Sequence, residues 1–119
     1  MILDLDIGNT LSKWRLKDTV SSEIRSRGAV WTREEWRPGA DIPDLDVVTA
    51  VRISSVARKQ VLDETVELLR KQVGVVHVAH STREALGVTC GYEEPQRLGV
   101  DRWLGALAGH HLTGGCCSV

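Results

Sequence analysis

The segment from residue 46 to residue 79 constrains the fold most, because a helix pattern in it lies between two apolar strand patterns. Residues 58–72 repeat apolar side chains every three or four positions, which predicts an amphipathic helix. The flanking runs, residues 46–56 and 75–79, are short and apolar, and Gly74 stops the helix. A strand–helix–strand order implies that the two strands pair in parallel. We therefore expect an α/β fold.

The first thirty residues predict three strands that fold back on one another. Residues 1–6 form a short apolar run, residues 11–16 alternate loosely, and residues 20–30 make a possible third strand. Turn residues at positions 8–9 and 18–19 separate them, which favours an antiparallel meander. Together with the two parallel strands, this predicts a five-stranded mixed sheet flanked by helices, with the first strand central and antiparallel to the second.

A capping pattern follows the third strand. Thr32 is followed three residues later by Glu35, as in the capping box that starts a helix. Pro38, Gly39 and Pro43 then interrupt the pattern. We expect a short helix that ends in a loop at these three residues.

Composition and cysteine use narrow the class of protein. Of 119 residues, 42% are hydrophobic, and fifteen basic and sixteen acidic side chains leave a net charge of −1, so nothing favours a nucleic-acid partner. No apolar stretch approaches the roughly 20 residues of a membrane helix, and the N-terminus lacks a secretory signal pattern. Cys90, Cys116 and Cys117 have no zinc-like spacing, and no ligand pattern joins His77 and His80. We expect a reduced, cytoplasmic protein without a membrane partner.

The first segment that could carry chemistry comes directly after the first strand. Asp6 is followed by Gly8, which lets the backbone approach oxygen atoms closely, and by the hydrogen-bond donors Asn9 and Thr10, with Lys13 behind them. Magnesium favours one or two carboxylates together with phosphate and water oxygens. The segment therefore indicates a magnesium-bound phosphate site. The alternative is a hairpin turn in which Asp6 only caps backbone amides.

The second such segment begins at Gly91 and runs into a predicted helix at residues 98–112. Gly99 precedes an acid and a base, Asp101 and Arg102, at the start of this helix. Asp101 could accept a hydroxyl proton while Arg102 binds a carboxylate or phosphate. The alternative is structural, since acidic residues favour a helix N-terminus and an exposed arginine partner contributes little.

Taken together, the two segments resemble the type III pantothenate kinase family. The first resembles its motif Asp-x-Gly-Asn-Thr/Ser-x-x-Lys-Trp, and the second resembles Gly-Tyr-x-x-Pro-x-x-Leu-Gly-x-Asp-Arg. The strand end at residues 53–56 also resembles the family. The matching residues are Asp6, Gly8, Asn9, Thr10, Lys13, Trp14, Gly91, Tyr92, Pro95, Leu98, Gly99, Asp101 and Arg102. They occur in the family's order and extend over most of the chain.

The resemblance implies a ribonuclease H-like, actin-like ATPase domain and a kinase, which is a transferase. Such enzymes transfer the γ-phosphate of ATP to the 4′-hydroxyl of pantothenate, the first step of coenzyme A synthesis, and work as homodimers. Residues 1–113 would be the N-terminal actin-like domain, and residues 114–119 the start of a second domain that is absent. The family's second phosphate motif, Asp-x-Gly-Thr-Ala, is missing, so we expect this chain alone to be inactive.

The resemblance also implies roles for individual residues. Asp101 would be the general base. The pantothenate-binding residues would be Tyr92, Gly99 and Arg102. The ATP and phosphate-binding residues would be Asp6, Gly8, Asn9, Thr10 and Lys13, with Asp6 also serving Mg²⁺. A monovalent cation, K⁺ or NH₄⁺, would bind outside this chain.

Two other functions remain open at this point. Some proteins that resemble these kinases are described as Bvg accessory factor-like transcriptional accessory proteins with the same fold. The presence of both Asp6 and Asp101 favours the kinase. The second alternative is a stand-alone binding or assembly domain.

Overall fold

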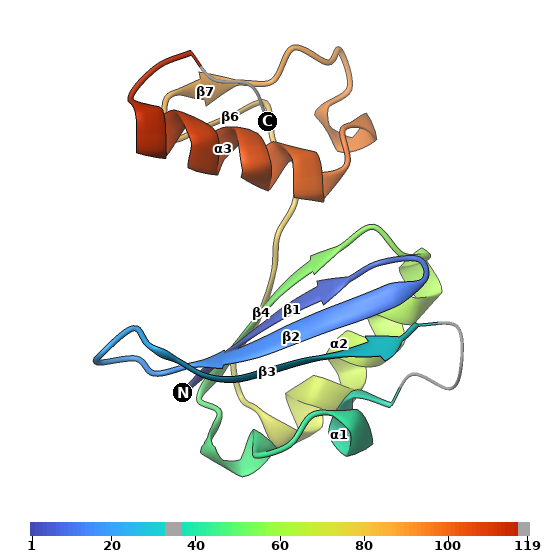
Figure 1. Ribbon diagram of the computed structural model, residues 1–119. Helices are drawn as coiled ribbons and strands as arrows, with labels where there is room; N and C mark the ends of the chain where they lie inside the picture. Colours follow the sequence, from blue (N-terminus) through green and yellow to red (C-terminus); the bar gives the residue numbers. More distant parts are fainter. Residues whose placement is uncertain (33–36, 117–119) are drawn as a thin grey trace. The chain divides into compact units, whose positions relative to one another are not determined.

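The computed structural model describes residues 1–32 and 37–116, which divide into two compact units, Met1–Val78 and Ala79–Val119 (Figure 1). The first unit holds β1 (Ile2–Ile7), β2 (Leu11–Lys17), β3 (Ile24–Trp31), α1 (Pro38–Asp41), the 3₁₀ turn η1 (Leu45–Val47), β4 (Ala50–Ser55), α2 (Lys59–Gln72) and β5 (Val76–Val78). The second unit holds β6 (Glu84–Ala85), β7 (Val88–Thr89), the 3₁₀ turn η2 (Pro95–Arg97) and α3 (Val100–Thr113).

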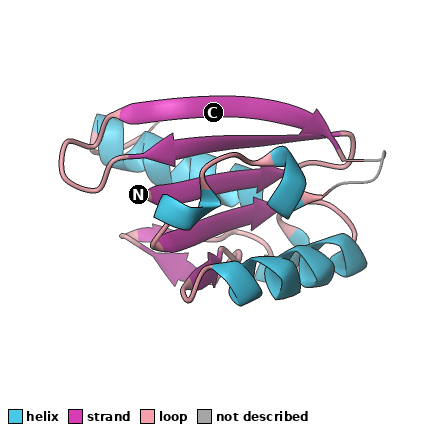
Figure 2. Cartoon of the chain, turned by 90° about the horizontal axis from the view of Figure 1, so that it is seen from below, coloured by secondary structure: helices cyan, strands magenta, loops and turns pink. Residues whose placement is uncertain are grey.

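The first unit contains the predicted five-stranded mixed sheet, with strand order β3-β2-β1-β4-β5. The central strand β1 pairs antiparallel with β2 and parallel with β4. β3 continues the antiparallel side, and β5 continues the parallel side (Figure 2). The expected fold class, the central place of the first strand and its antiparallel partner are therefore confirmed.

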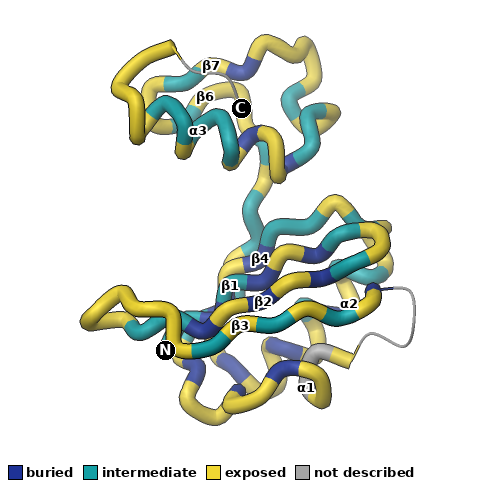
Figure 3. Tube along the Cα trace, viewed as in Figure 1, coloured by how far each residue is buried: buried dark blue, intermediate teal, exposed yellow. Residues whose placement is uncertain are grey.

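One face of the sheet carries the hydrophobic core. Buried and exposed positions alternate along β1 and β2, as expected for strands with one covered face (Figure 3). The apolar side of α2 packs on this face, and α1 lies beside α2. The most deeply buried apolar residues of this core are Leu3, Leu5, Ile7, Leu16, Val51, Ile53, Leu69 and Val73. On the opposite face, the strands β1, β2 and β4 present polar side chains, among them Asp4, Asp6, Lys13 and Arg52.

The third strand begins later than predicted, at Ile24 instead of residue 20. The carboxylate of Asp18 accepts hydrogen bonds from the backbone N–H groups of Val20 and Ser21, at 2.8 and 3.0 Å. Ser22 adopts the left-handed backbone conformation, with φ of 62°. These interactions hold the segment as a turn and leave Val20 93% exposed. A local polar cap has overridden the weak strand pattern.

The segment between β3 and β4 also differs from the prediction. Pro38–Asp41 is a helical turn, not a loop, because proline is well suited to the first position of a helix. The hydroxyl of the buried Thr32 pairs with Ser12 Oγ at 2.7 Å. The rest of the expected capping box, Glu35, lies outside the described residues. The strand predicted for residues 46–56 is shorter, since its first part is the turn η1.

The second unit contains a hairpin that the sequence did not predict. β6 and β7 pair antiparallel across a two-residue turn, Leu86–Gly87, in which φ is positive at both residues. The predicted final helix is confirmed as α3, and Gly114, with φ of 71°, ends it. Within residues 1–32 and 37–116, no helix is long and apolar enough to cross a membrane.

Candidate functional site

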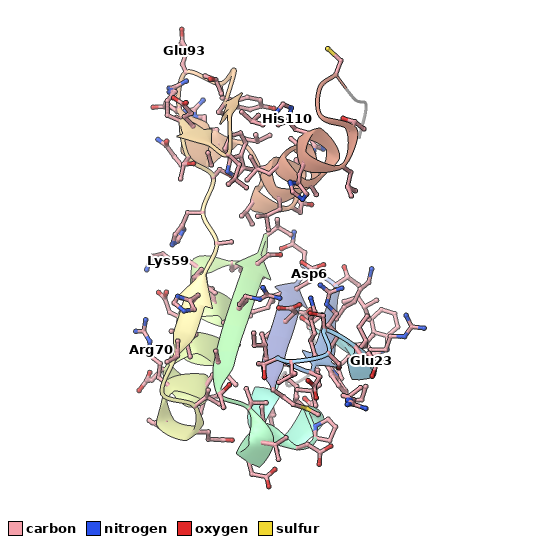
Figure 4. The ribbon with its side chains drawn as sticks, turned by 90° about the vertical axis from the view of Figure 1, so that its left-hand side faces the viewer. Asp6, Glu23, Lys59, Arg70, Glu93 and His110 are labelled. Carbon is pink, nitrogen blue, oxygen red and sulfur yellow. The ribbon has the colours of Figure 1, made fainter. Side chains whose placement is uncertain are left out.

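One group of predicted site residues lies at the carboxyl end of the central strand. Asp6 is exposed on the polar face of β1, beside Ser54 of the parallel strand β4 (Figure 4). Ser54 Oγ donates a hydrogen bond of 2.9 Å to Asp6 Oδ1. Asp6 Oδ2 makes no hydrogen bond to the other described residues, so one carboxylate oxygen is available to a ligand.

The turn after β1 requires glycine for a steric reason. The N–H of Gly8 donates to the carbonyl oxygen of Leu11 across 3.1 Å, which closes the turn. A Cβ atom at position 8 would lie 2.5 Å from that same carbonyl oxygen, closer than real contacts allow. The tight turn therefore requires glycine at position 8.

The other residues of the first segment surround this turn. Asn9 and Thr10 are exposed in it. Lys13 is exposed on β2 and stands directly opposite Asp6 in the antiparallel register, so its ammonium group belongs to the same face. Trp14 has a different place: it is buried against Gly28 of β3, where an added Cβ would lie 2.7 Å from its ring. Trp14 therefore serves the core.

Asp4, two residues before Asp6 on the same face, is engaged by two arginines. Arg52 contacts both of its oxygens, at 2.6 and 2.9 Å, and Arg15 donates to Oδ2 at 2.8 Å. Burial raises the pKa of Asp4, but the hydrogen bonds from Arg52 and Arg15 outweigh it and leave the pKa below its usual value. In return, the hydrogen bond to Asp4 raises the pKa of Arg52. Asp4 is thus a structural ion-pair centre, whereas Asp6 retains an open oxygen.

The other group of predicted site residues lies in the second unit. Gly99 is the N-cap residue of α3, and Asp101 and Arg102 lie exposed in its first turn. Asp101 Oδ1 accepts a hydrogen bond of 2.8 Å from the backbone N–H of Arg102. Tyr92 lies in the preceding loop with 45% of its surface exposed. The structure thus brings these four predicted residues into one unit, and Asp6 and Lys13 into the other.

The structure adds two side chains that sequence reasoning missed. Ser54 holds Asp6, and only the register of β4 beside β1 brings the two residues together. Arg83 binds backbone carbonyl groups of the loop that carries Tyr92. Because carbonyl acceptors have no sequence signature, no local pattern could have found Arg83.

The Asp6 carboxylate is the feature of the first unit that could hold a metal ion. In the described part of the chain, no group of three or more histidine, cysteine or acidic residues is placed to hold a metal. A single carboxylate with one open oxygen is instead typical of magnesium bound mainly by phosphate and water. Asp6 and the tight Gly8 turn fit that kind of site.

Comparison with known proteins decides the family. A model of the type III pantothenate kinase family matches residues 2–119. The chain belongs to this family. The type III pantothenate kinase of Chromohalobacter salexigens is 85% identical over 119 residues, which are 100% of this chain and 43% of that protein. A type III pantothenate kinase of Pseudomonas putida is 39% identical over 122 residues, covering 48% of its length. One of Cellvibrio japonicus is 34% identical over 112 residues and is covered to 44%.

These matches confirm the resemblance and the fold class that it implied. The chain spans less than half the length of the type III pantothenate kinases that it matches. The relatives are named as kinases, so the comparisons give no support to the accessory-protein alternative.

Proposed function

We propose that this chain supplies the phosphate-binding and pantothenate-binding residues of an ATP-dependent pantothenate kinase. The observation that carries the proposal is the family match over residues 2–119, with Asp6 and Asp101 both exposed at the positions of the two family motifs. The product would be 4′-phosphopantothenate, and the step would be the first of coenzyme A synthesis.

Asp6 and the turn after β1 would bind the phosphate end of ATP. Gly8 keeps this turn tight, so the exposed backbone and the side chains of Asn9 and Thr10 can approach phosphate oxygens. Lys13, opposite Asp6, would add a positive charge for the same phosphates. Asp6 would hold Mg²⁺ through its open carboxylate oxygen. Bound Mg²⁺ would neutralise charge on the phosphate groups.

Asp101 would act as the general base toward the 4′-hydroxyl of pantothenate. It lies exposed in the first turn of α3. Its Oδ1 accepts a hydrogen bond from the backbone N–H of Arg102, which orients the carboxylate. Arg102 would bind the pantothenate carboxylate, and Tyr92 and Gly99 would line the remainder of its site.

Several properties of the whole enzyme belong to the same proposal. We propose a cytoplasmic homodimer that needs K⁺ or NH₄⁺ in addition to Mg²⁺, with the monovalent-cation site outside these residues. We also propose that residues 1–113 act as one actin-like domain and that residues 114–119 lead into a second one. Because phosphoryl transfer depends on clamping the nucleotide, this chain alone should not phosphorylate pantothenate.

The test uses a chimera of this chain with the C. salexigens relative. In the chimera, the 119 residues replace the matching segment of that protein, which is 85% identical. ATP-dependent phosphorylation of pantothenate by the chimera, and its loss in the double variant Asp6→Asn, Asp101→Asn, would support the proposal. A folded chimera that binds neither ATP nor pantothenate would overturn it.

A further inference from the structure

One side chain, Arg83, fastens the loop that follows the β6–β7 hairpin. Its Nη1 donates to the carbonyl oxygens of Cys90 and Tyr92, at 3.1 and 2.5 Å. Its Nη2 donates to the carbonyl oxygen of Glu93. The backbone N–H of Cys90 in turn donates to the carbonyl oxygen of Arg83 at 2.7 Å. A single guanidinium group therefore binds three carbonyl groups within four consecutive residues.

The loop depends on these bonds because it lacks regular structure. Residues 90–94 belong to no helix or strand, and residues 91–94 are exposed. Their carbonyl groups therefore have no strand partners to fix their direction. A guanidinium group is planar and presents its donors in a rigid fork, so it can set the orientation of several carbonyl groups at once.

The far end of the same loop is tied to the same short segment of chain. Ser81 Oγ donates a hydrogen bond of 2.6 Å to the carbonyl oxygen of Leu98, directly before the N-cap residue Gly99 of α3. The pair Ser81 and Arg83 thus holds the loop at both of its ends. Tyr92 lies at one end, and Asp101 follows the other.

We propose that Arg83 is a positioning residue that holds Tyr92 in place for pantothenate. This inference rests on the proposed function, because Tyr92 is a pantothenate contact only within it. Arg83 acts through the backbone: its fork binds the carbonyl group of Cys90, two residues before Tyr92, and the carbonyl groups of Tyr92 and Glu93. Lysine at this position keeps the charge but offers a single donor point, so it cannot bind all three carbonyl groups in the same geometry.

The experiment measures steady-state kinetics of the chimera carrying Arg83→Met or Arg83→Lys. For Arg83→Met, we expect KM for pantothenate to rise about 10-fold, because a misplaced contact weakens binding of one substrate. We expect KM for ATP and kcat to stay within about twofold, and Arg83→Lys to recover part of the loss. Equal changes in both KM values and kcat, or none in KM for pantothenate, would overturn the proposal.

A matched control and a second readout separate this idea from the proposed function. Arg97 lies a few residues further on, in the turn η2, and its side chain forms an exposed ion pair with Glu94, so Arg97→Met should leave KM for pantothenate unchanged. Fluorotyrosine incorporated at position 92 alone reports the loop by ¹⁹F NMR, without any activity. Arg83→Met should shift or broaden this signal, and Arg97→Met should not. An unchanged signal in a folded Arg83→Lys or Arg83→Met variant would overturn the positioning role even if the protein is not a kinase.

Discussion

Ser54 Oγ on β4 donates a hydrogen bond to Asp6 Oδ1 on β1 across 2.9 Å. The bond is possible because the parallel register sets the two residues side by side on the polar face of the sheet. It occupies one carboxylate oxygen and orients the other. Ser54, which the sequence shows only as one residue at the end of a strand, therefore supports the Asp6 carboxylate that is proposed to bind magnesium.

Removing this hydrogen bond should weaken nucleotide binding without removing the carboxylate. In the chimera, Ser54→Ala should raise KM for Mg-ATP about fivefold, since a hydrogen bond to a charged group at an exposed site contributes modestly. Asp6→Asn should raise it more. The neighbouring Ser55 is a matched control, because its Oγ accepts from the backbone N–H of Ala57 instead. Equal effects of Ser54→Ala and Ser55→Ala would contradict the proposed support.

Replacing the proposed base should slow the chemical step. Asp101→Asn keeps the shape of the side chain and removes its basicity, so kcat of the chimera should fall by roughly 10²–10⁴. Far-UV circular dichroism should be unchanged, because Asp101 is exposed. Asp63→Asn, which removes only an exposed ion pair with Lys59 on α2, serves as the control. Turnover that survives Asp101→Asn at the parent rate would refute the role of Asp101.

The turn after β1 should not tolerate any side chain at Gly8. A Cβ atom there would meet the carbonyl oxygen of Leu11 at 2.5 Å, so Gly8→Ala forces the backbone to move. We expect the free energy of unfolding to fall by about 1–3 kcal/mol, measured by urea denaturation. Gly74→Ala is the matched control, because a Cβ there meets nothing within 4 Å. If both variants unfold at the same urea concentration, the steric argument is wrong.

Stability should decline in acid as the carboxylate of Asp18 titrates. Hydrogen bonds from the backbone N–H groups of Ser21 and Val20 lower its pKa from 3.8 to about 2. A carboxylate with a lowered pKa in the folded state stabilises the fold above its unfolded pKa, and this contribution is lost as pH falls toward the folded value. Thermal midpoints between pH 5 and pH 2 should therefore fall less steeply for Asp18→Asn than for the parent. Parallel curves would count against the role of Asp18.

Removing the Asp4 carboxylate should lower the free energy of unfolding and have little effect on catalysis. Asp4→Asn leaves Arg15 and Arg52 without their shared carboxylate. Both arginine side chains are about half exposed, at 49% and 50%, so solvent screens the loss and we expect about 1 kcal/mol in urea denaturation. The KM of the chimera for Mg-ATP should change less than in Asp6→Asn. A larger rise in Asp4→Asn would mean that the two aspartates have been assigned the wrong roles.

The sheet was predictable because its strands have clear hydrophobic patterns and because the short connections limit how the strands can pair. The strand–helix–strand pattern of residues 46–79 predicts that its two strands pair in parallel. The turn at Gly8 favours a hairpin between the strands before and after it. The hairpin β6–β7 was not predictable, since its strands have two residues each. Its turn also places Leu86 at a φ of 48°, where glycine or asparagine would have been the usual signal.

The candidate site was predictable only for residues that lie within compact motifs. Asp6 and Asp101 stand out in the sequence because each lies two residues from a glycine at the end of a predicted element, and the family resemblance supplies their proposed roles. Ser54 and Arg83 act on groups that are distant in sequence or belong to the backbone, so their roles became visible only with the register of β4 and the path of the loop after Thr89.

The ion pair on the polar face also helps to select the register of β1 on β4. A slide of β1 by two residues along β4 would keep its apolar side chains on the core face, so hydrophobicity alone does not select one alignment. One such slide would set Asp6 opposite Arg52 and turn the ligand-binding carboxylate into half of an ion pair. The other would set Asp4 opposite Ser54 and leave Arg52 without its acid. The ion pair between Asp4 and Arg52 thus favours the observed register of β1 on β4. In this register the carboxylate of Asp6, two residues further on, is left free for a ligand.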